Sequence, residues 1–275
     1  MKLFLGGVRG STPAPGPAFV RYGGNTPCVA VTDDRGTHLI LDAGTGIRRV
    51  PEYLGTTPFH GTILFTHLHW DHIQGLPFFT SLDREDASAH LIVPEHDDPL
   101  GVLRRVMSPP YFPIDPTGLR GFCSFARFEE GTHQIEGFEV VARRVPHKGG
   151  PTFGYRVSDG SRSFAYISDH NPAEVGEGPD GLGEYHQSVM DLVEGVDVLI
   201  HDAQYLSSEF ASGALFGHAA AEYAVGLAEK ASAGKVLLFH HHPDRTDDEL
   251  DAVRSNLQRS GLSVEVAVEG EVLDV

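Results

Sequence analysis

The sequence is poor in cysteine and has no long apolar run. Its 275 residues contain only Cys28 and Cys123, which excludes a disulfide framework and makes a reducing, cytoplasmic setting the expectation. No apolar stretch approaches the roughly 20 residues that a membrane-spanning helix needs, and the first ten residues lack the apolar centre of a signal peptide. We therefore expect neither a membrane protein nor a secreted one.

Basic residues are also scarce. Lysine and arginine number 21 against 38 aspartates and glutamates, which gives a formal net charge of −17. Because affinity for nucleic acids comes mainly from basic side chains that neutralise phosphates, no stable complex with DNA or RNA is expected. A small phosphate-bearing substrate remains compatible with this charge, since bound metal ions reverse the local field. The 16 histidines are the unusual abundance.

The hydrophobic pattern predicts one layered domain that spans residues 1–275. No repeat or linker divides the chain, and short strand patterns in the first half give way to alternating strands and helices in the second. Strands are predicted at 2–5, 28–32, 38–41, 61–66, 138–145, 152–157, 164–167, 196–200, 235–239 and 263–268. Helices are predicted at 185–193, 218–231 and 247–259. The proline-rich segment 94–121 is expected to be a lid or insertion loop without regular structure.

The strongest local signal is the stretch 67–72, His-Leu-His-Trp-Asp-His, which directly follows a predicted strand. In an extended chain, residues two apart share a face, so His67 and His69 can hold one ion together. A turn into a helix near Trp70 would then bring Asp71 and His72 round to a second ion. A solvated histidine-rich loop is the alternative, and this spacing makes it a poor explanation.

This stretch resembles the H-x-H-x-D-H motif of the metallo-β-lactamase fold superfamily. The stretches 23–28 (Gly-Gly-Asn-Thr-Pro-Cys) and 41–46 (Leu-Asp-Ala-Gly-Thr-Gly) are similar to the opening strands of its phosphodiesterase and RNase Z-like branch. The resemblance covers most of the chain. It implies an α/β fold, a four-layer αββα sandwich of two mixed β-sheets with the metals at one sheet edge.

The resemblance also implies two divalent metal ions and their ligands. The implied ligands are His67, His69 and His147 for the first ion, Asp71, His72 and His240 for the second, and Asp169 as a bridge. Nitrogen and carboxylate ligands suit Zn²⁺, with Mn²⁺ and Fe²⁺ left open. His241 and His242 adjoin His240, which is preferred because it comes first after its strand, where the backbone is best fixed.

A second pair, Asp202 and His218, matches the acidic residue and the assisting histidine of that branch. Asp202 would orient His218 through a hydrogen bond, and His218 would stabilise the transition state or protonate the leaving oxygen. The hydroxyl residues that usually follow this histidine in the branch are replaced here by Ala219 and Ala220. The alternative is that His218 is only a residue at a helix N-terminus.

Together these features predict a metal-dependent hydrolase of small phosphodiesters, with cyclic nucleotides as the leading example. Two ions would generate a hydroxide nucleophile at a site that includes Asp71, and His218 would assist the leaving group. An RNase Z-like nuclease is one alternative. It is disfavoured because only 21 residues separate His147 from Asp169, where that family carries a long tRNA-gripping arm. A lactone, thioester or β-lactam hydrolase and an inactive metal-binding protein are two more. Dimers are frequent in these families, so a homodimer stays open.

Four further expectations concern the surroundings of the site. Trp70 is expected to pack beneath the metal loop, and Asp42 is expected to brace backbone rather than to bind metal. Tyr111 and Phe112 could stack on a nucleobase or cover the core. Histidines without a partner at a regular spacing, among them His186, are expected at the surface.

Overall fold

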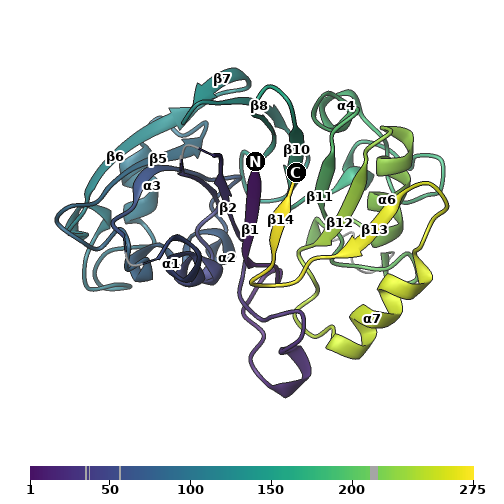
Figure 1. Ribbon diagram of the computed structural model, residues 1–275, viewed down its shortest axis with the longest axis horizontal. Helices are drawn as coiled ribbons and strands as arrows, with labels where there is room; N and C mark the ends of the chain where they lie inside the picture. Colours follow the sequence, from purple (N-terminus) through teal and green to yellow (C-terminus); the bar gives the residue numbers. More distant parts are fainter. Residues whose placement is uncertain (35, 37, 56, 211–215) are drawn as a thin grey trace.

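Two seven-stranded mixed sheets form the centre of the protein, seen in a computed structural model that describes residues 1–34, 36, 38–55, 57–210 and 216–275 (Figure 1). In spatial order, the first sheet contains β14 (Val272–Asp274), β1 (Lys2–Gly7), β2 (Cys28–Thr32), β3 (His38–Leu41), β4 (His60–Leu64), β5 (Ser88–Pro94) and β6 (Phe122–Phe128). The second contains β13 (Ser263–Val266), β12 (Lys235–Phe239), β11 (Val198–Asp202), β10 (Ser163–Ile167), β9 (Phe153–Ser158), β8 (Phe138–Arg144) and β7 (Gly131–Ile135).

Helices cover the outer face of each sheet and complete the four layers. They are α1 (Val50–Leu54), α2 (Trp70–Ile73) and α3 (Pro99–Arg104) on the first sheet, and α4 (Gln187–Val193), α6 (Ala221–Lys230) and α7 (Asp247–Asn256) on the second (Figure 1). Short 3₁₀ turns cover Pro17–Phe19, Thr45–Arg49, Leu76–Phe78, Pro116–Gly118 and Pro172–Glu174. Among the described residues, no helix has the length and apolar character that crossing a bilayer requires. The predicted αββα sandwich is confirmed.

Strands buried on both faces explain why the core has three parts. Successive side chains of a strand point to opposite faces. In β1, Leu3 and Leu5 therefore enter the core between the sheets, while Phe4 enters the core under α1. In β10, Tyr166 faces the first sheet and Ile167 faces the helices of the second. Such strands are nearly continuous apolar runs, as their sequences show.

Parallel pairing brings the carboxyl ends of several strands to one edge of each sheet. In the first sheet β3 pairs with β4 in parallel, and in the second β10, β11 and β12 are parallel neighbours. Residues that directly follow these strands are therefore held close together, which is the usual position of sites in α/β folds. Asp42 and His240 directly follow β3 and β12, Asp169 follows β10 after one residue, and His67 follows β4 after two.

Two expectations about local structure were wrong. The segment 94–121 contains a helix, α3, because Asp98 caps it by accepting a hydrogen bond from the Gly101 N–H and Pro99 occupies its first turn, where a proline costs nothing. The helix predicted at 218–231 begins only at Ala221, since Ala220 is extended and pairs with Tyr205. His218 therefore precedes the helix.

A fully buried arginine joins the end of β1 to the segment that follows β12. The Arg9 guanidinium donates hydrogen bonds to the carbonyl oxygens of Gly23, His242 and Arg245, at 2.8 to 3.2 Å. Burial lowers its pKa to about 10, which still leaves it charged at neutral pH. Arg9 thus fixes the chain just beyond His240.

Replacing Arg9 by methionine should lower the free energy of unfolding by about 3 kcal/mol or more, because several buried carbonyls lose a charged donor. Urea unfolding followed by circular dichroism measures this loss. The control is Arg84→Met, since Arg84 is partly exposed and forms a surface pair with Asp86, and it should leave the midpoint nearly unchanged. Equal midpoints for the two variants would show that Arg9 has no such structural role.

Candidate metal centre

The structure brings all the sequence-predicted site residues together. His67 and His69 follow β4 in extended conformation, and α2 then turns Asp71 and His72 toward them. The other members follow strands of the second sheet or lie in its loops: His147, Asp169, Asp202, His218 and His240. The cluster therefore lies where the strand ends of both sheets meet.

Five triads of the described residues in this cluster have the spacing of metal ligands, and two of them contain neither Asp169 nor a member of the His218–Asp202 pair. His67, His69 and His147 offer nitrogen atoms that all lie within 4.8 Å of one another, and so do the ligand atoms of Asp71, His72 and His240. These are the two sets that the resemblance implies. His241 instead hydrogen-bonds the Ala267 carbonyl oxygen, so His240 is the member of this run that enters the cluster.

Asp169 lies between the two triads. Its Oδ1 is 3.6 Å from His147 Nε2 and 3.4 Å from His240 Nε2, and its Oδ2 is 3.0 Å from His72 Nε2. Although buried, its Oδ2 and the Nε2 atoms of His67 and His72 form no aligned hydrogen bond with any residue that the structure describes. Buried polar atoms rarely remain unsatisfied, and cations placed between them would satisfy all three.

Hydrogen bonds behind the imidazoles direct their lone pairs into the cluster. His147 Nδ1 donates to the Gly217 carbonyl at 2.6 Å, and His72 Nδ1 donates to Asp42 Oδ2 at 2.9 Å. His67 Nδ1 lies 3.1 Å from the Thr66 hydroxyl, which itself donates to Asp42. Each ring therefore carries a proton on the far nitrogen and directs Nε2 into the cluster. This is the arrangement found behind metal-bound histidines.

Asp42 is the fully buried anchor of this network. Its carboxylate accepts hydrogen bonds from the backbone N–H and the hydroxyl of Thr66, from His72 Nδ1 and from the Tyr166 hydroxyl. The predicted brace is confirmed, and the structure extends it, because Asp42 also orients a ligand histidine. Its backbone, like that of His240, adopts a positive φ, with values of 60° and 57°. Strained conformations of this kind occur preferentially at functional sites.

The electrostatics of the cluster favour cations. Burial lowers the pKa of His67, and it lowers that of His147 to about 4, which leaves both rings neutral at pH 7. Burial acts to raise the pKa of Asp71 and Asp169, but neighbouring histidines outweigh it and keep both carboxyls ionised. Burial acts to lower the pKa of His72, but Asp169, Asp71 and Asp42 hold it well above its usual value, and a cation bound at Nε2 would replace that proton. Imidazole and carboxylate donors in this arrangement suit divalent metals, so the residues present fit the implied ions.

His218 and Asp202 form the predicted pair at the side of the cluster. Asp202 Oδ2 lies 3.0 Å from His218 Nδ1 and also accepts from the backbone N–H groups of His170 and Ala219. Burial acts to lower the pKa of His218, yet the adjacent Asp202 carboxylate raises it above its usual value. The ring lines an open hollow of about 400 Å³ over the cluster, so its other nitrogen is available to a ligand.

A chain of three histidines behind Asp202 was missed by sequence reasoning. His186 Nδ1 caps α4 by accepting from the Val189 N–H, and its Nε2 lies 2.9 Å from His170 Nε2. His170 Nδ1 then donates to His201 Nε2 at 3.0 Å, and His201 Nδ1 donates to the Asp202 carbonyl at 2.7 Å. The surface position expected for His186 was therefore wrong. No spacing pattern connects these residues, and only the fold does.

The expected position of Trp70 beneath the metal loop was also wrong. Its side chain is 74% exposed rather than packed beneath the metal loop. The four-residue helix α2 buries Asp71, His72 and Ile73, and this orientation leaves its first residue outside. Trp70 therefore lines the same hollow as His69 and His218.

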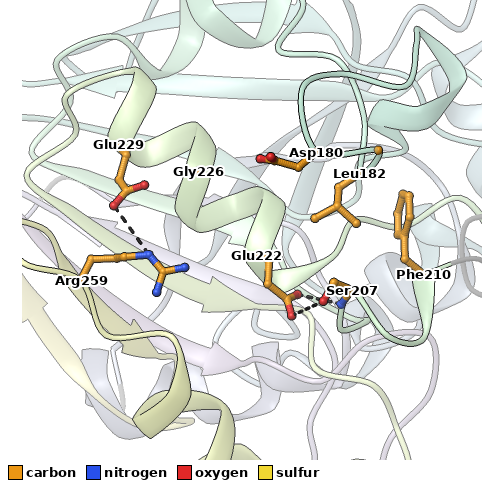
Figure 2. Close-up of a pocket in the computed structure, with 9 residues that line it drawn as sticks. Asp180, Leu182, Ser207, Phe210, Glu222, Gly226, Glu229 and Arg259 are labelled. Carbon is orange, nitrogen blue, oxygen red and sulfur yellow. Dashed lines mark hydrogen bonds and ion pairs between the residues drawn. The ribbon is translucent and has the colours of Figure 1, made fainter.

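Figure 2 shows a different hollow, of about 670 Å³, beside α6. Three of the four charged side chains that line it have partners: Glu222 accepts hydrogen bonds from the Ser207 hydroxyl and N–H, and Arg259 lies 3.7 Å from Glu229. None of the cluster residues lines it. We therefore place the functional site at the strand ends.

Comparison with known families agrees with this geometry. The model of the beta-lactamase superfamily domain matches residues 37–241, which include the stretch 67–72, His147, Asp169 and His218. The chain belongs to the beta-lactamase superfamily. The predicted superfamily is thus confirmed, and so is the predicted enzyme class, a metal-dependent hydrolase.

Individual members of the superfamily resemble the chain over most of its length. A Ribonuclease Z of Exiguobacterium sibiricum is 28% identical over 225 residues, 68% of this chain and 73% of the relative. The metallo-beta-lactamase fold protein YhfI from Bacillus subtilis shares the fold with a TM-score of 0.73 at 18% identity, and 99% of each chain is covered. A diphosphatase from the PhnP family gives a TM-score of 0.72 at 20% identity, covering 100% of this chain and 97% of that one.

Replacing Asp42 by asparagine should weaken metal binding about 10-fold to 100-fold, because an uncharged amide with one acceptor oxygen cannot accept from both Thr66 and His72 as the carboxylate does. Titration of the metal-free protein with Zn²⁺ against a competing chelator measures this change. Asp86→Asn is the matched control, since Asp86 is exposed and pairs with Arg84. If both variants bind Zn²⁺ as tightly as the wild type, Asp42 does not support the site.

Two adjacent glycines offer a stricter test of the position of His69. Both have positive φ, but a Cβ at Gly149 would lie 2.5 Å from His69 Nε2, whereas a Cβ at Gly150 would meet nothing within 4 Å. Backbone strain is thus common to the two alanine variants, and displacement of His69 occurs in only one. Gly149→Ala should weaken Zn²⁺ binding more than Gly150→Ala in the same titration, and the reverse order would contradict the assignment of His69.

Proposed function

We propose that the protein hydrolyses small phosphodiesters with two divalent metal ions, Zn²⁺ in the first instance, and that cyclic nucleotides are among its substrates. The observation that carries the proposal is the pairing of two ligand triads around Asp169 with a His218–Asp202 pair that faces the same hollow. When bound, such ions lower the pKa of a coordinated water and neutralise charge on the phosphate.

The residues of this chain would supply the remaining functions. His67, His69 and His147 would hold one ion, Asp71, His72 and His240 the other, and Asp169 would bridge them. Asp202 fixes the tautomer and orientation of His218 through the hydrogen bond at Nδ1. The Nε2 proton of His218 is then available to the leaving-group oxygen, which makes His218 the general acid in the proposal.

Two observations favour a small substrate. The net charge of −17 opposes the approach of a long polyanion. The chain between His147 and Asp169 is fully described, and it contains only the antiparallel hairpin of β9 and β10 with a short turn near Asp159. A phosphodiester that enters a hollow of about 400 Å³ needs neither a basic surface nor a gripping arm.

An RNase Z-like nuclease is the second candidate. The specific observation in its favour is the match to a Ribonuclease Z at 28% identity. The two candidates share the metal centre and the His218–Asp202 pair, and they differ in the size of the substrate. A panel that contains a cyclic nucleotide, bis(p-nitrophenyl) phosphate and a precursor tRNA therefore separates them. Turnover of the first two without the third supports our proposal, and turnover of the tRNA alone supports the nuclease.

Replacing His218 by asparagine should lower kcat on the accepted diester by roughly 10²-fold to 10⁴-fold, because the leaving oxygen loses its proton donor. The metal content of the variant should stay at the wild-type level, which elemental analysis of the same preparation checks. His60→Asn is the control, since His60 is exposed on β4. An unchanged kcat in the His218 variant would remove this residue from the mechanism.

A further inference from the structure

Three large aromatic side chains are exposed on one side of the metal centre. They are Trp70 of α2, Phe78 in the 3₁₀ turn that follows, and Tyr111, with exposed fractions of 74%, 52% and 79%. Large apolar groups gathered on one patch mark binding surfaces more often than chance exposure. This patch is therefore a candidate ligand-binding surface.

These side chains line a hollow of about 520 Å³, a size typical of small-molecule sites. The other lining residues are Ile73, Gln74, Pro77, Arg105, Val106, Met107 and Phe112. Arg105 is the only charged residue among them. It forms no salt bridge within the part of the chain that the structure describes, so its donors are available. The hollow thus suits a flat, uncharged ring with hydrogen-bond acceptors on its edge.

Trp70 connects this hollow to the metal centre. It lines both the aromatic hollow and the smaller hollow over the cluster. It also directly precedes Asp71 in α2. A molecule whose phosphate lies at the cluster can therefore extend one ester arm past Trp70 into the aromatic hollow.

The far wall of the hollow is held in place before any ligand binds. Arg104 pairs with Asp115 at 2.9 Å, which ties the end of α3 to the turn at 116–118. The Phe112 ring packs edge-on against Phe78 at 5.7 Å between centroids. A wall fixed in this way costs little ordering when a ring enters, as in most preformed sites.

We propose that the aromatic hollow binds the nucleobase of a nucleoside phosphodiester, with the base between Trp70 and Tyr111 and its acceptor edge toward Arg105. The proposal rests on the proposed function, since it places the phosphate at the metal centre. It narrows the substrate class from small phosphodiesters in general to nucleoside esters. Aromatic side chains stack on all nucleobases, so the site would require that a nucleobase is present without distinguishing one base from another.

A binding experiment tests the site without any turnover. Trp70 is the only tryptophan, so the fluorescence of the metal-loaded protein reports on the two hollows that Trp70 lines. Adenosine 5′-monophosphate should quench it strongly, whereas ribose 5-phosphate, which lacks the base and reaches only the hollow over the metal centre, should quench it much less. Tyr111→Ala should raise the Kd for adenosine 5′-monophosphate about 10-fold or more. Phe122→Ala should not, because Phe122 is equally exposed on β6 but does not line the hollow.

Quenching by both phosphates alike, or an unchanged Kd in Tyr111→Ala, would overturn the base site. An altered oligomeric state of Tyr111→Ala with unchanged nucleotide affinity would also overturn it, because the patch would then be a contact between copies of the chain. Gel filtration of the same samples distinguishes this case.

Kinetics separate the base site from the proposed function. Thymidine 5′-(p-nitrophenyl phosphate) and methyl p-nitrophenyl phosphate share a leaving group and differ only in the nucleoside. Tyr111→Ala should lower kcat/KM on the first about 10-fold to 100-fold and spare the second. An equal loss of kcat/KM on both esters would refute the base site without contradicting the proposed phosphodiesterase activity. If the wild type cleaves neither ester yet only adenosine 5′-monophosphate quenches Trp70 strongly, the phosphodiesterase proposal fails and the base site stands.

Discussion

The crowding of carboxylates and imidazoles around Asp169 is the constraint on which the rest of the structure depends. His72, His147 and His240 place their Nε2 atoms within 3.6 Å of its two oxygens, and water is almost completely excluded. Lone pairs gathered in this way repel one another unless cations lie between them. Divalent ions between these atoms would remove that repulsion, as the chemistry of the donor set requires.

The two-sheet scaffold holds these carboxylates and imidazoles close together. Parallel strand ends fix the backbone of Asp42, His67, Asp169 and His240, and buried hydrogen bonds then fix each side chain from behind. Asp42 supports the ligands contributed by the first sheet, and Asp202 supports His218 at the second. His218 and the ligands of the first sheet are thus oriented by separate carboxylates, so a change at His218 leaves the hydrogen bonds around Asp42 intact.

Much of this site could be predicted from the sequence, because its strongest signal is local. The stretch 67–72 carries its own geometry, and the family resemblance that it supports implied His147, Asp169 and His240 as further ligands. The missed features depend on contacts between distant segments. The chain from His186 to Asp202 joins residues without any shared period, and the exposure of Trp70 depends on which face of α2 the core covers. Likewise, α3 escaped prediction because its prolines suggested a loop, although a proline in the first turn favours a helix.

The central claim is that seven side chains bind two divalent ions, and the metal content of the purified protein tests it most directly. Elemental analysis of the wild type and of Asp169→Ala, prepared side by side, gives the number of ions per chain. The account predicts about two ions in the wild type and a loss of at least one in the variant, with the fold retained by circular dichroism. A wild-type protein without bound metal, or a variant with the same content, would contradict it.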